Sequence, residues 1–146
     1  MKKMASSQEM NKIADQAIEQ IQLRTRLGKG VNKNEGQESK LIPLAASTKK
    51  ARKRKKVPRP NRSYLTETGQ MLNSITKRIA SGTINLFFSG TRDDGLSNAE
   101  LADIHQNQGA GRSKVKRPFF YISAKDVKKL RFTVRQRLRM FLTILT

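Results

Sequence analysis

The stretch LTETGQMLNSITKRIASGTINLFFS, residues 65 to 89, contains both kinds of secondary structure from which we expect the fold to be built. Its first half predicts a short helical turn over Gln70 to Ile75. Thr66 or Thr68 can cap that turn, because hydroxyl side chains accept hydrogen bonds from the first amide groups of a helix. Gly69 allows the backbone to bend sharply just before it.

The second half of the stretch predicts a β-hairpin. Thr76 to Ala80 and Thr83 to Ser89 read as strands, and Ser81-Gly82 reads as the tight turn between them. One face of the second strand is apolar and carries Ile84, Leu86 and Phe88, with Phe87 on the opposite face.

Two further helices are predicted downstream. Ser97 to Glu100 is a capping-box pattern, and the helix it starts should end at Gln108 to Gly111. Pro118 to Ile122 follows as a short strand or extended run. Ser123 to Asp126 is a second capping-box start, and the apolar residues after it recur every three or four positions. They are Val127, Leu130, Val134, Leu138, Phe141 and Leu145.

Upstream, residues 6 to 27 predict a helix capped by Ser6 or Ser7, with a narrow apolar face. That face consists of Ile13, Ala14, Ala17, Ile18 and Ile21. Residues 28 to 62 are rich in Gly, Asn, Gln, Ser and Lys, which indicates a functional loop, an arm or disorder. Within them, Ser47 to Lys56 could form a short helix without an apolar face.

The order of elements predicts an α+β fold, in which a small antiparallel sheet is packed by the N- and C-terminal helices. We expect an N-terminal helix over residues 1–27, a long basic loop or extended arm over 28–64, and an α+β core over 65–146. The core and the N-terminal helix should form a single domain.

The chain of 146 residues has 31 Lys and Arg against 11 Asp and Glu, a net charge of +20. Such a charge favours a polyanionic partner: nucleic acid, an anionic membrane or an acidic protein surface. There is no Cys, which excludes disulfides and thiolate sites. No apolar run approaches the ~18 residues of a membrane span, so we expect a soluble protein without a membrane partner.

The positive charge is concentrated in two places. Nine of the fourteen residues from Lys49 to Arg62 are Lys or Arg, and residues 112 to 139 hold eleven more with one acid, Asp126. Contacts to phosphate give no sequence specificity, and no platform of spaced aromatic residues is evident for stacking bases. The predicted contacts to DNA or a partner protein are Lys49, Lys50, Arg52, Lys53, Arg54, Lys55, Lys56, Arg59, Arg62, Arg112, Lys114 and Lys116.

The sequence gives no reason to expect catalysis, a metal or a cofactor. His105 is the only histidine, and although Asp103 or Glu100 could accompany it, no nucleophile elbow is present. Asp93-Asp94 lacks a second acidic cluster and reads as a solvated turn. The segment from Gly109 to Lys114 lacks the spacing of a phosphate-binding loop and reads as a flexible basic loop.

Three stretches occur in an order that resembles a known family. They are LTETGQMLNSI (65–75), ELADIHQNQGAG (100–111) and KRPFFYISAKDVKKL (116–130). Together they resemble the small virion-morphogenesis or tail-completion proteins of tailed bacteriophages. Those proteins carry Leu-x-x-Thr-Gly-x-Leu-x-x-Ser-Ile, then Ala-x-Ile-His-x-x-Gly, then Arg-Pro-Phe and a final helix. The matching residues here are Leu65, Thr68, Gly69, Ser74, Ile75, Ala102, Ile104, His105, Gly109, Arg117, Pro118 and Phe119.

The resemblance implies a structural virion protein without enzymatic activity, which multimerises as a ring at the head–tail junction or tail top. It would be assembled in the host cytoplasm, and its partners would be further copies of itself and neighbouring neck or tail proteins. The excess charge would then face an acidic neighbouring ring or contact genomic DNA nonspecifically. The alternative is a nonspecific nucleic-acid-binding basic protein.

Overall fold

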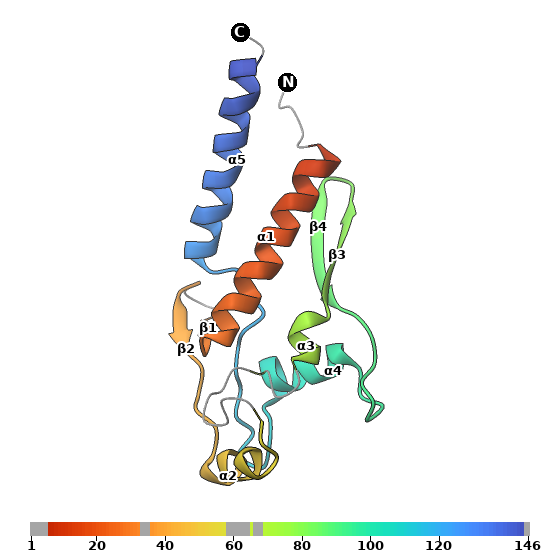
Figure 1. The fold of residues 1–146 in the computed structure, drawn as a ribbon, viewed down its shortest axis with the longest axis vertical. Coiled ribbons are helices and arrows are strands. Elements are labelled where there is room, and N and C mark those ends of the chain that lie inside the picture. The colour runs from red at the N-terminus through yellow and green to blue at the C-terminus, as the bar shows by residue number, and fades with distance from the viewer. Residues whose placement is uncertain (1–5, 33–35, 58–64, 66–68, 145–146) are drawn as a thin grey trace.

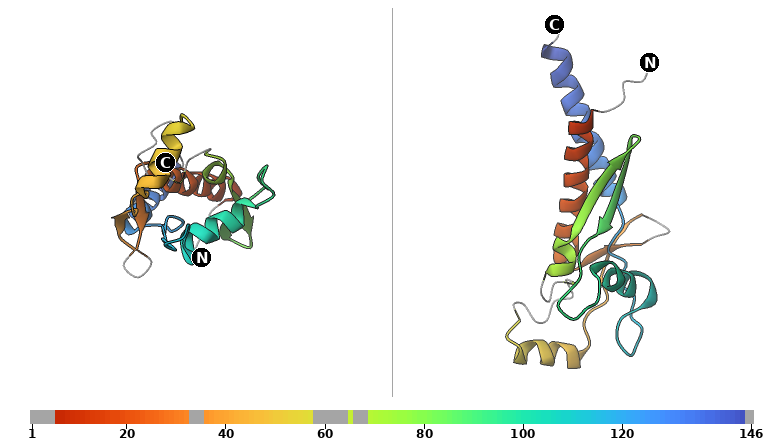
Figure 2. Two further views of the ribbon diagram at one scale, coloured as in Figure 1. Left: turned by 90° about the horizontal axis from the view of Figure 1, so that it is seen from below. Right: turned by 90° about the vertical axis from the view of Figure 1, so that its right-hand side faces the viewer.

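The computed structural model describes residues 6–32, 36–57, 65 and 69–144, with side chains up to residue 134. The molecule is elongated: α1 and α5 lie side by side along its length, and α2 lies at the opposite end from the C-terminus (Figures 1 and 2). The elements are α1 (Ser7–Arg26), β1 (Lys29–Val31), β2 (Glu38–Lys40), α2 (Ala46–Arg54), α3 (Gln70–Asn73), β3 (Ile75–Ala80), β4 (Thr83–Phe88), α4 (Asn98–Asp103), the π-helical turn η1 (Ile104–Gln108) and α5 (Ala124–Ile144).

The fold is α+β, as predicted, with two small antiparallel sheets instead of one. Helix α1 lies between α5 and the β3–β4 hairpin (Figure 1). Its predicted start is confirmed, because Ser6 and Glu9 form a reciprocal capping box. Its predicted apolar face is buried at Ala14, Ala17 and Ile21. Burial of this face against both neighbours makes α1 the central element of the body.

The β3–β4 hairpin confirms the predicted turn. Ala80 pairs with Thr83, so only Ser81 and Gly82 connect the strands. Both have positive φ, 48° and 74°, which is the turn geometry that matches the twist of a hairpin. The predicted face of Ile84, Leu86 and Phe88 is half-buried and Phe87 is exposed.

The second hairpin, β1–β2, was not expected, because it lies in the segment predicted to be a loop or arm. Lys29 pairs with Lys40, and Val31 N–H donates to the Pro118 carbonyl oxygen at 2.9 Å. A Cβ at Gly30 would lie 2.2 Å from that same oxygen, so only glycine permits this close approach. Val31 and Leu41 are buried. The first part of the segment therefore belongs to the folded body.

The downstream helices begin where predicted. Ser97 and Glu100 form a capping box at α4, and Ser123 and Asp126 form another at α5. The helix that starts at α4 widens into η1 and stops at Gly109, whose φ is 92°. Residues 118–122, predicted as a short strand or extended run, form no strand and bend at Phe120 and Tyr121.

The apolar core joins segments from the whole chain. Its buried cluster contains Ile21, Met71, Leu72, Ile75, Ala102 and Phe119. Phe119 is fully buried, and its ring centroid lies 6.0 Å from that of Phe88 and 6.3 Å from that of Phe120. Phe119 therefore anchors the packing of the core.

A buried ion pair ties the two long helices together. Arg24 on α1 contacts Asp126 at the start of α5, and both side chains are almost completely buried. Arg24 Nη2 also donates to the carbonyl oxygens of Phe119 and Tyr121, at 2.9 and 2.6 Å. Burial lowers the pKa of Arg24 and the Asp126 carboxylate opposes that shift. The two hydrogen bonds from Arg24 hold the segment of residues 118–122 against α1.

Candidate functional site

The residues that carry the family resemblance lie close together in the fold. Ile75, Ala102 and Phe119 are buried in the core cluster, and Leu65 packs against it. Gly69 has a φ of 73° at the start of α3, as the predicted sharp bend requires. The remaining members are Ser74, Ile104, His105, Gly109, Arg117 and Pro118, all at least half-buried. Thr68 lies outside the described residues.

Two of these motif residues join the second stretch to the third. The backbone N–H of Arg117 donates to the His105 carbonyl oxygen at 2.6 Å. The Arg117 side chain then reaches the segment before α2, donating from Nε to the Ile42 carbonyl oxygen at 3.0 Å and from Nη2 to that of Pro43 at 3.2 Å. Arg117 therefore holds the start of the basic helix α2 beside η1.

His105 is neutral at neutral pH. Burial, and to a smaller extent the positive charges of Arg117 and Arg52, lower its pKa to about 4. Its Nδ1 atom finds no hydrogen-bond partner among the described residues. The nearby cations disfavour its protonation, so this imidazole is a weak base.

A concave surface, here called the basic basin, opens between α2, η1 and the turn that follows η1. Its volume is about 1120 Å³. Its described lining includes five cationic residues, three hydroxyl side chains and several apolar side chains, and no Asp or Glu. The lining residues used below are Ser47, Thr48, Arg52, Lys55, Leu65, Met71, Arg92, Leu101, His105, Arg112, Ser113, Val115 and Arg117.

The turn after η1 gives the basin one of its walls. Ala110 and Val115 exchange two backbone hydrogen bonds, at 2.9 and 3.1 Å. A Cβ at Gly109 would lie 2.1 Å from the Lys114 carbonyl oxygen, so the glycine permits this closure. The segment expected to be a flexible basic loop is thus a tight turn, and it places Arg112 and Ser113 in the lining.

The basin contains only some of the predicted contact residues. Arg52, Lys55 and Arg112 line it. The other predicted contacts in the described chain do not: Lys49, Lys50, Lys53, Arg54, Lys56, Lys114 and Lys116. Arg59 and Arg62 lie outside the described residues. The structure adds Arg92, which pairs with Asp94 at 3.2 Å, and Arg117, which the sequence indicated only as a residue of the family resemblance.

Helix α2 confirms the prediction of a short helix without an apolar face. None of its residues is buried. It lies at one end of the molecule, away from the paired helices α1 and α5 (Figures 1 and 2). The charged side chains of α2 therefore lie at the surface, and Arg52 lines the basin. None of them belongs to the core.

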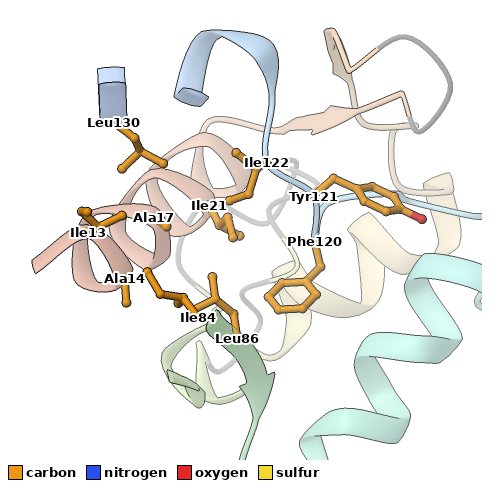
Figure 3. Close-up of a pocket in the computed structure, with 10 residues that line it drawn as sticks. All are labelled: Ile13, Ala14, Ala17, Ile21, Ile84, Leu86, Phe120, Tyr121, Ile122 and Leu130. Carbon is orange, nitrogen blue, oxygen red and sulfur yellow. The ribbon is translucent and has the colours of Figure 1, made fainter. Parts of the chain in front are cut away.

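A second hollow is apolar and lies on the other side of the core. Figure 3 shows its side chains converging from α1, β4, the segment of residues 120–122 and α5. Its volume is about 400 Å³. The lining consists of Ile13, Ala14, Ala17, Ile21, Ile84, Leu86, Phe120, Tyr121, Ile122 and Leu130. We call this the apolar groove.

The described residues contain no group of three or more His, Asp or Glu side chains placed to hold a metal ion. None of the helices in the described part of the chain is long and apolar enough to cross a membrane. No family model matches the sequence, and no curated protein or solved structure matches the chain.

Proposed function

We propose that this chain is a structural subunit of a tailed-phage virion, forming a ring at the head–tail junction or the top of the tail. The observation that carries the proposal is the convergence of the three motif stretches. Leu72 and Ile75 from the first, Ala102 from the second and Phe119 from the third share one buried cluster. If the likeness of the three stretches to the family were accidental, we would not expect residues from all three to share one cluster.

The surface supports a subunit that packs against copies of itself. Leu27 and Phe132 are 68% and 64% exposed, and the apolar groove is open in the single chain. Each described strand pairs with one neighbour, so each hairpin has edges at which a further strand could pair. A closed ring buries such surfaces without leaving an unpaired end.

The test is assembly of particles from a phage genome in which this chain is deleted. We expect heads and tails to accumulate separately, and wild-type protein added to the extract should restore joining, counted by electron microscopy. Normal joining of heads to tails without the chain would overturn the proposal.

The second candidate is a nonspecific nucleic-acid-binding protein, which the net charge of +20 and the basic basin favour. It predicts DNA or RNA affinity that falls steeply with salt, by a slope of about 0.9 per phosphate contact. Neutralising α2 with Lys50→Gln, Lys53→Gln and Arg54→Gln separates the candidates. The nucleic-acid-binding protein would lose most of its function, whereas the ring subunit should still fold and join heads to tails.

A further inference from the structure

Helix α5 presents a row of cations to solvent. In Figure 1 the helix lies at the edge of the molecule, with α1 beside it. Asp126 and Leu130 are directed toward α1, since Asp126 contacts Arg24 and Leu130 lines the apolar groove. A helix turns by about 100° per residue, so positions two residues from Leu130 lie on its outer side. The exposed cations of the described part of α5 are Lys125, Lys128, Lys129 and Arg131.

The charge of this row is not balanced within α5. The helix contains seven Lys and Arg and a single acid, Asp126. That acid is buried against Arg24, so it is already used inside the fold. Because a helix rises about 1.5 Å per residue, cations three or four positions apart lie about 4.5–6 Å apart along its axis. The outer side of α5 is thus a cationic surface with closely spaced charges.

An aromatic ring lies among these cations. Phe132 is 64% exposed, and it is the one large apolar side chain of the described part of α5 that is exposed. Lys128 and Lys129 precede it by four and three positions, so the two cations and the ring share one side of the helix. The surface therefore offers contacts to negative charge and to a flat apolar ring at the same place.

A nucleic-acid strand with unpaired bases supplies both of these contacts. Its phosphates repeat at every nucleotide, and its open bases stack on aromatic side chains whatever their sequence. Three of the four exposed cations are lysines, which bind phosphate as point charges, whereas paired recognition of carboxylates favours arginine. An acidic protein is thus the weaker match. An anionic membrane also matches less well, because a helix that lies in a membrane surface needs a broad apolar face, which Phe132 alone does not form.

We propose that the outer side of α5 binds an unpaired nucleic-acid strand. Lys125, Lys128 and Arg131 contact its phosphates, and Phe132 stacks on one of its bases. A duplex offers phosphates but no open base, so it binds less tightly than a single strand. The inference stands apart from the proposed virion role, which does not require α5 to bind nucleic acid. It also assigns the contact to α5, whereas the second candidate function assigns it to α2.

The test is fluorescence anisotropy of the purified full-length protein with a short fluorescein-labelled oligothymidylate strand. A labelled duplex and a labelled strand of abasic sugars, both of the same length, separate stacking from charge. Unlabelled polyglutamate represents an acidic protein as competitor. At physiological salt we expect the oligothymidylate to bind more tightly than the duplex and the abasic strand, and to resist displacement by polyglutamate.

Two aromatic variants form a matched pair. Phe132→Ala should weaken binding of the oligothymidylate about tenfold, the loss typical of one stacked base, and should change binding of the abasic strand by less than about twofold. Phe87→Ala is the control, because that ring is 37% exposed on β4 and lies outside the proposed surface. It should change either affinity by less than about twofold. Both rings are exposed, so circular dichroism should show that the variants remain folded.

Two double variants test the charges in the same way. Lys128→Gln with Arg131→Gln removes two exposed cations from α5, and Lys53→Gln with Arg54→Gln removes two from α2. Each phosphate contact on a single strand contributes about 0.7 to the slope of log affinity against log salt. We expect the α5 pair to reduce that slope by about 1.4 and the α2 pair to leave it nearly unchanged.

Four results would overturn the proposal. They are binding of the duplex or the abasic strand as tightly as the oligothymidylate, equal losses in Phe132→Ala and Phe87→Ala, a slope reduced equally by the α5 and α2 pairs, and displacement of the strand by polyglutamate as readily as by unlabelled strand. The assay uses the isolated protein and needs no particle. Its failure would leave the head–tail joining result unchanged, so the two proposals fail separately.

Discussion

The two regions that hold arginines near the core differ in how they balance charge. At the junction of the two long helices, Arg24 is buried and is paired with Asp126 and with two carbonyl oxygens. In the basic basin, Arg52 and Arg112 lie at a concave surface whose described lining has no carboxylate. The first arrangement is buried and balances its charge within the chain, whereas the second lies at an open surface.

The difference separates residues that hold the fold from residues that are available for recognition. A buried charge must be balanced within the chain, since an unpaired one would cost several kcal/mol. A half-exposed cation needs no such compensation, because water screens its charge. We therefore expect substitutions around Arg24 and Phe119 to affect stability, and substitutions at the rim of the basin to leave it nearly unchanged.

The largest expected effect is on the core. Phe119→Ala removes a fully buried ring and should reduce the free energy of unfolding by about 3–5 kcal/mol. Phe132→Ala is the control, because that ring is 64% exposed, and it should change stability by less than about 1 kcal/mol. Urea denaturation measures both. Similar losses in the two variants would mean that Phe119 does not anchor the core.

The second effect concerns the buried ion pair. Asp126→Asn leaves the Arg24 charge buried without the carboxylate that it contacts and should cost about 3–4 kcal/mol of folding free energy. Asp15 provides the comparison, because it pairs with Lys77 at 2.5 Å on the surface. Asp15→Asn should cost less than about 1 kcal/mol, and thermal unfolding of both variants checks the contrast.

The third prediction is a pH dependence from His105. Its folded pKa of about 4 lies below the ordinary value of 6.5, so the unfolded chain takes up the proton first as the pH falls. The stability contributed by neutral His105 is complete above pH 6.5 and is lost progressively between pH 6.5 and 4. The loss is up to about 3 kcal/mol, and solvent screening of the half-buried ring reduces it.

Denaturation of the wild type and of His105→Gln across this pH range isolates that contribution, because other ionisable groups are common to both. The wild type should lose more stability than the variant as the pH falls from 6.5 to 4. Parallel curves would show that the surroundings of His105 do not disfavour its charged form.

The smallest expected effect is that of Arg112→Gln on folding. Arg112 is exposed, so its replacement should change the free energy of unfolding by less than about 0.5 kcal/mol. If urea denaturation showed that Arg112→Gln lowers the free energy of unfolding by more than about 2 kcal/mol, Arg112 would stabilise the fold, as Arg24 does, and the two regions would not differ in this way.

The sequence predicted the elements whose signals are local. Capping boxes at Ser6, Ser97 and Ser123 mark three helix starts, and Ser81-Gly82 marks the hairpin turn. Each signal acts over a few residues, so it is visible without knowledge of the fold.

The rest depends on contacts between distant residues. Strands β1 and β2 have three residues each and no alternating apolar pattern, and β1 is held by the bond from Val31 to Pro118. Arg24 and Asp126 are 102 positions apart. The basin likewise needs α2 and the turn after η1 to meet, which no local pattern indicates. In the sequence, Arg52 and Arg112 are marked only by their positive charge, and no local pattern indicates that they line one surface.

The most direct test of the proposed role is a cryo-electron-microscopy reconstruction of the neck of the intact phage particle that we propose contains this chain. We expect a closed ring of copies at the head–tail junction or tail top, with the α1–α5 body recognisable in each copy. Absence of the chain from the particle, or its presence only along packaged DNA, would contradict the account.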